Sequence, residues 1–110
     1  MNERHKHSIW GVLLVVCLLG GGLISVTIGT DNDWDLRNYH LYNAYAQLHG
    51  RLFYDLAPAQ LQSFLNPLLD IPFYGLFIVF NDAPRLYAFA MGLPAGLFCL
   101  VFLRIVWDHA

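Results

Sequence analysis

Long apolar stretches separated by short polar ones form the main pattern of this chain, and they predict helices that cross a membrane. Residues 9–29 run for 21 positions without a charged side chain. At about 1.5 Å per residue, such a helix is about 30 Å long, the thickness of the hydrocarbon core of a bilayer. A cleaved signal peptide usually has an apolar stretch of only about 7–15 residues, followed by a small-residue cleavage site. Because residues 26–30 offer no such site, we expect a retained anchor helix.

Two further apolar stretches follow. Residues 68–80 are only 13 positions long and are interrupted by Asp70 and Pro72, so the pattern leaves open a tilted span or a re-entrant segment. Residues 86–107 predict a third helix. Within it Gly92 and Gly96 form a small-xxx-small pattern, which is typical of a face where two membrane helices pack closely.

Residues 30–67 form a polar loop that contains an amphipathic helix. Between Leu36 and Leu48, apolar and aromatic residues recur at steps of three and four, and Gly50 is suited to follow the helix end. The basic tail holds Arg4 and Lys6 close together. By the positive-inside tendency, we expect the N-terminus in the cytoplasm and the loop outside an inner membrane that the chain crosses several times.

The composition supports a bilayer as the main solvent. Of the 110 residues, 57% are hydrophobic and 13% are charged, against about a quarter charged in soluble domains. A net charge of -2 without a basic run argues against nucleic-acid binding. Cys17 and Cys99 both lie in apolar stretches, and no spacing matches a metal-ligand or cofactor motif. We therefore expect an all-α integral membrane protein with lipid as a partner, no metal and no cofactor.

Three carboxylates, Asp31, Asp33 and Asp35, stand within five residues after the anchor helix. Carboxylates at a helix start are stabilised by the helix dipole and the free N–H groups. For Asp31 and Asp33 we favour this structural interpretation. For Asp35 a second observation is relevant.

The loop resembles the first outer loop of polytopic glycosyltransferases with the GT-C fold, in particular the family-87 mannosyltransferase-like group. The likeness lies in Asp35-Leu-Arg-Asn-Tyr39, the small residues Ala44 and Ala46, Gly50, Tyr54-Asp55 and Asn66-Pro67-Leu68. It extends over residues 9–105 and matches only the start of such an enzyme. The resemblance implies a polyprenyl-phosphate sugar as donor, and a general base in this loop that deprotonates the acceptor hydroxyl. Asp35 is the first candidate for that base and Asp33 the second.

Four other loop residues are candidates for substrate binding, each beside a structural alternative. Arg37 and Arg51 can bind a lipid phosphate, or form salt bridges to Asp33 or Asp55. Tyr39 can stack on a sugar ring or belong to an interfacial aromatic belt. His40 can orient a phosphate or a sugar hydroxyl, or be structural.

We therefore expect the chain to be the N-terminal fragment of a membrane glycosyltransferase that acts at the outer face, with the remainder of a longer chain as its partner. Two alternatives stay open. One is a small non-catalytic membrane subunit. The other is a piece of a polytopic transporter, in which Asp70 would mark the path of an ion or substrate.

Overall fold

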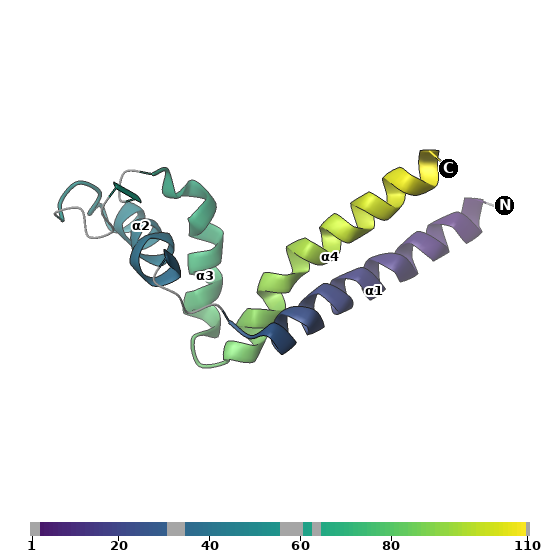
Figure 1. Ribbon diagram of the computed structural model, residues 1–110, viewed down its shortest axis with the longest axis horizontal. Coiled ribbons are helices and arrows are strands. Elements are labelled where there is room, and N and C mark those ends of the chain that lie inside the picture. Colours follow the sequence, from purple (N-terminus) through teal and green to yellow (C-terminus); the bar gives the residue numbers. More distant parts are fainter. Residues whose placement is uncertain (1–2, 31–34, 56–60, 63–64, 110) are drawn as a thin grey trace. The chain divides into compact units, whose positions relative to one another are not determined.

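The computed structural model describes residues 3–30, 35–55, 61–62 and 65–109, and these residues form helices and turns with no strand (Figure 1). The predicted all-α fold is therefore confirmed. The described part divides into two compact units, one of α1 and α4 and the other from residues 31–83. The loop helix and the second apolar segment therefore belong to one unit.

The first unit consists of α1, Glu3–Ile28, and α4, Pro84–His109. Each has 26 residues and is therefore about 39 Å long. Both are long and apolar enough to cross a membrane. The predicted helices at residues 9–29 and 86–107 are confirmed. Both helices also extend into the polar residues that flank the apolar stretches, because helical backbone hydrogen bonding can continue there without apolar side chains.

Glycines bring the two helices of this unit close together. A Cβ atom added to Gly21 would lie 2.5 Å from the carbonyl oxygen of Gly92 and 2.7 Å from the amide nitrogen of Gly96. Near one end of the pair, the ring of Trp10 meets that of Trp107 edge to face, with 6.3 Å between centroids. The packing face predicted from Gly92 and Gly96 is confirmed, and its counterpart on α1 is Gly21.

The second unit begins with the amphipathic loop helix. Its first turn is the π-helix η1, Leu36–His40, and the α-helix α2, Leu41–Leu48, follows directly. The N–H of Leu41 donates to the carbonyl of Leu36, a five-residue step. Gly50 follows the helix with a φ of 64°, a left-handed conformation that glycine adopts without steric cost.

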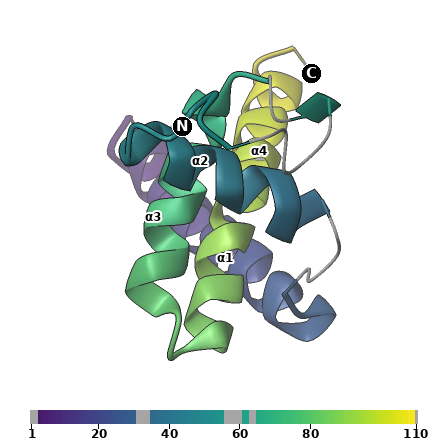
Figure 2. The ribbon, with the colours of Figure 1, turned by 90° about the vertical axis from the view of Figure 1, so that its left-hand side faces the viewer.

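The core of the second unit is formed by the small residues of α2. Ala44 and Ala46 are fully buried, and their lack of bulk allows η3, Pro67–Leu69, and α3, Asp70–Phe80, to pack against α2. In Figure 2, α2 crosses over α3. The predicted apolar segment at residues 68–80 is thus a helix, and it is shorter than α1 or α4.

Candidate functional site

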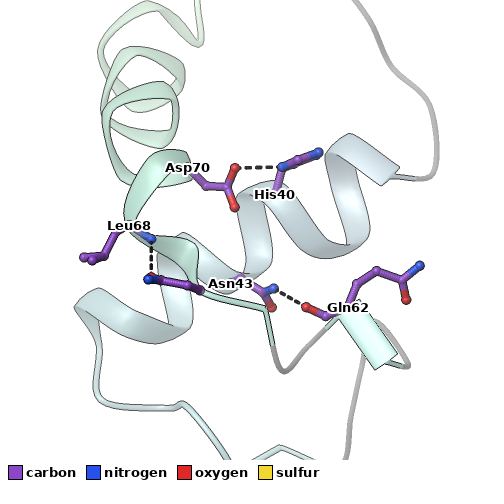
Figure 3. A network of polar contacts seen from close by, with 6 residues as sticks. His40, Asn43, Gln62, Leu68 and Asp70 are labelled. Atoms are coloured by element: carbon purple, nitrogen blue, oxygen red, sulfur yellow. Dashed lines mark hydrogen bonds and ion pairs between the residues drawn. The ribbon is translucent and has the colours of Figure 1, made fainter.

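An imidazole and a carboxylate from two different elements meet at the start of α3. His40 ends η1 and Asp70 begins α3, and His40 Nδ1 lies 2.7 Å from Asp70 Oδ1 (Figure 3). The side chain of Asp70 is 17% exposed and that of His40 is 41% exposed. When Asp70 is ionised, its oxygen accepts a hydrogen bond from Nδ1–H, which leaves the lone pair on Nε2. The unprotonated Nε2 of His40 can then accept a hydrogen bond.

The ring of Tyr39 lies against that of His40, with 3.9 Å between centroids. Together with Asp70, this contact restricts the orientation of the imidazole. In the transporter alternative Asp70 marks a transport path, whereas its place at the entry to an apolar helix gives it a structural role. Its bond to His40 at the first residue of α3 agrees with the structural role, because a half-buried carboxylate needs a partner.

Asn43 joins α2 to the segment that contains Gln62. It is 1% exposed, and its Nδ2 donates to the carbonyl of Gln62 at 2.7 Å. Its Oδ1 is buried and has no partner among the described residues. Asn66 Oδ1 accepts from the N–H of Leu68 at 3.0 Å and caps η3. The sequence gives Asn43 no special role, because nothing in the spacing reveals its bond to a residue 19 positions away.

A second polar cluster follows the end of α2. Arg51 donates to both oxygens of Asp55, from Nε at 3.1 Å and from Nη2 at 2.7 Å. Tyr42 donates its hydroxyl hydrogen to the same carboxylate, and the guanidinium of Arg51 lies 5.3 Å from the centroid of the Tyr54 ring. The salt bridge to Asp55, one of the alternatives for Arg51, is therefore present.

The electrostatics of this cluster follow from its bonds. Hydrogen bonding to Arg51, and next to Tyr42, lowers the pKa of Asp55 below its usual value. The hydrogen bond from Tyr42 to Asp55 raises the pKa of the Tyr42 hydroxyl. The carboxylate is thus held ionised, and a phosphate that binds Arg51 has to compete with it. The phosphate role of Arg51 remains a prediction.

The candidate base Asp35 stands at the exposed start of η1. Its side chain makes no capping hydrogen bond. Asp35 is the residue before η1, and His40 is its last residue. Arg37 is exposed on the same turn, and Asp33 lies outside the described residues. Of the predicted site, Arg37, Tyr39 and His40 belong to η1 and Asp35 directly precedes it, whereas Arg51 belongs to the cluster at the other end of α2.

In the part of the chain that the structure describes, no three His, Cys, Asp or Glu side chains are grouped as metal ligands. The chemistry that this arrangement offers is hydrogen bonding and proton acceptance by a carboxylate and an imidazole. Comparison with family models, curated proteins and solved structures gives no match.

Proposed function

We propose that this chain is part of an inner-membrane glycosyltransferase that transfers a sugar from a polyprenyl-phosphate donor to an acceptor hydroxyl at the outer face. The observation that supports this most is the position of Asp35. Asp35 is exposed at the start of the loop helix, and its carboxylate makes no capping bond. A proton acceptor needs this accessibility, whereas a carboxylate that only stabilised the helix would be expected to bond to the free N–H groups.

Each residue has a role in this proposal. Asp35 accepts the proton of the attacking hydroxyl as the bond to the sugar forms and the polyprenyl phosphate leaves. His40 accepts a hydrogen bond from a neighbouring hydroxyl, and Tyr39 offers an aromatic face to a sugar ring. Arg37 and Arg51 neutralise the phosphate of the donor.

The proposal also assigns a membrane topology. α1 and α4 cross the bilayer as a pair, and the basic tail with Arg4 and Lys6 keeps the N-terminus in the cytoplasm. The acidic loop then lies outside, where the headgroup of a polyprenyl-phosphate sugar is accessible. The remainder of the donor site is supplied by further helices of a longer polytopic protein, as the resemblance implies.

The test is the variant Asp35→Asn, introduced at the gene's own locus so that the protein is otherwise unchanged. Membranes are incubated with a panel of radiolabelled undecaprenyl-phosphate hexoses, and transfer to acceptors is measured. Asparagine keeps the size of aspartate and can cap a helix, but it cannot accept a proton. We expect transfer to fall by about a hundredfold or more, with normal insertion into the membrane.

Two control variants distinguish the alternatives. Asp82→Asn alters an exposed carboxylate in the turn before α4 and should leave transfer unchanged. Asp33→Asn should have a weaker effect than Asp35→Asn, and the reverse order would make Asp33 the base. If all three variants retain transfer, the loop is not the catalytic site, and a lipid-binding subunit or a transporter is the better account.

A further inference from the structure

The relative direction of α1 and α4 determines on which side of a membrane the segment between them begins and ends. Trp10, near the start of α1, packs against Trp107, near the end of α4. A Cβ atom on Gly22, near the end of α1, would meet the ring of Phe89, near the start of α4. The helices are therefore antiparallel (Figure 1). If both cross a bilayer, the chain leaves α1 and enters α4 on the same side.

This register excludes α3 as a further crossing. A crossing by α3 would carry Phe80 to the opposite face, yet α4 begins at Pro84. Four residue steps reach at most about 14 Å, less than half of the roughly 30 Å of the hydrocarbon core. The helix itself has 11 residues and is only about 16 Å long.

Nevertheless, α3 has the surface of a membrane helix. Asp70 is its only charged residue, and none of its residues is buried within the unit. Large apolar side chains remain exposed after α2 has packed against it: Phe73, Ile78 and Val79, the last at 72%. The one carboxylate stands at the first residue and is bonded to His40. The residues that follow Asp70 on α3 are suited to an apolar solvent.

We propose that α3 is a half-membrane helix, embedded in the leaflet on the side where α1 ends and α4 begins, with lipid acyl chains covering Phe73, Ile78 and Val79. The partner of this surface is thus the bilayer. The connection of α3 to α4 favours lipid acyl chains as the contact of this surface. Only three residues link the end of α3 to a helix that crosses the same bilayer. The inference rests on the proposed membrane location and does not depend on glycosyl transfer.

Single-cysteine variants of the full chain test this proposal, in a background with Cys17→Ala and Cys99→Ala. Asn38→Cys, Asp82→Cys and His109→Cys are exposed in turn to an impermeant maleimide on intact cells and after lysis. We expect Asn38→Cys and Asp82→Cys to react from outside, and His109→Cys only after lysis. Reaction of Asn38→Cys and Asp82→Cys from opposite sides would show that α3 crosses, and would overturn the proposal.

Depth is measured with Val79→Cys carrying an environment-sensitive NBD label, in vesicles of phosphatidylethanolamine and phosphatidylglycerol. We expect blue-shifted emission that doxyl-labelled lipid quenches, while the same label at Asp82→Cys should emit as in water. Water-like emission at Val79→Cys would also overturn the proposal. Asp35→Asn should leave all labelling unchanged, so a catalytic failure of the proposed function and a failure of this topology are distinguishable.

Discussion

Replacing Gly21 by alanine adds one methyl group at the closest approach of α1 and α4. The added carbon would lie 2.5 Å from the carbonyl oxygen of Gly92, whereas ordinary contacts begin at 3.4 Å. The helices must therefore separate by about 0.9 Å, the difference between these distances. Because both opposing atoms are backbone, no side-chain rotation relieves the clash. Overpacking of this kind costs about 1–3 kcal/mol.

Gly20→Ala is the matched control for this prediction. A Cβ atom at Gly20 has no neighbour within 4 Å, yet both substitutions gain the same helix propensity of about 1 kcal/mol. The difference between the two variants therefore isolates the clash. We expect Gly21→Ala to lower the free energy of separating the helices by about 1–3 kcal/mol relative to Gly20→Ala.

The measurement uses the two native thiols. Cys17 and Cys99 are free thiols on α1 and α4, and the backbone of Cys17 lies against Gly96, one helical turn before Cys99. The protein is titrated from mild detergent into SDS and briefly oxidised at each step. The fraction of chains whose two thiols escape alkylation is then determined by mass spectrometry. Gly21→Ala should lose the disulfide at a lower SDS fraction than Gly20→Ala, and identical midpoints would show that the two backbones are not in contact.

Three further predictions concern residues 31–83. Because its bonds to Arg51 lower the pKa of Asp55, this carboxylate stabilises the fold above about pH 4, and the contribution is lost as the pH falls through the lowered pKa. Thermal unfolding against pH should show this loss, and Asp55→Asn should remove it. Asn66→Ala deletes the cap of η3 and should cost about 1 kcal/mol in chemical unfolding, while Asn66→Asp, which keeps the acceptor, should cost less. Asp70→Ala should shift His40 from the Nδ1–H tautomer toward the Nε2–H tautomer in ¹⁵N NMR spectra, and unchanged imidazole shifts would show that the two side chains are not bonded.

Several features of the candidate site were identifiable in the sequence because they depend on neighbours along the chain. The three carboxylates Asp31, Asp33 and Asp35 predicted a helix start, and Asp35 directly precedes η1. The pair of Arg51 with Asp55 is four residues apart, so the sequence could include it among the alternatives. The partner of His40 is 30 residues away, and no local pattern indicates a pairing over that distance.

The apolar lengths of residues 9–29 and 86–107 determined by themselves that this protein forms two long helices, because helical rise and bilayer thickness set the required number of residues. The small residues Gly92 and Gly96 likewise predicted a packing face. Only the tertiary structure decided that this face meets Gly21 in an antiparallel register, and that η1 winds as a π-helix. The register depends on how the two backbones fit against each other, because many pairings have the same local pattern and differ only in close contacts.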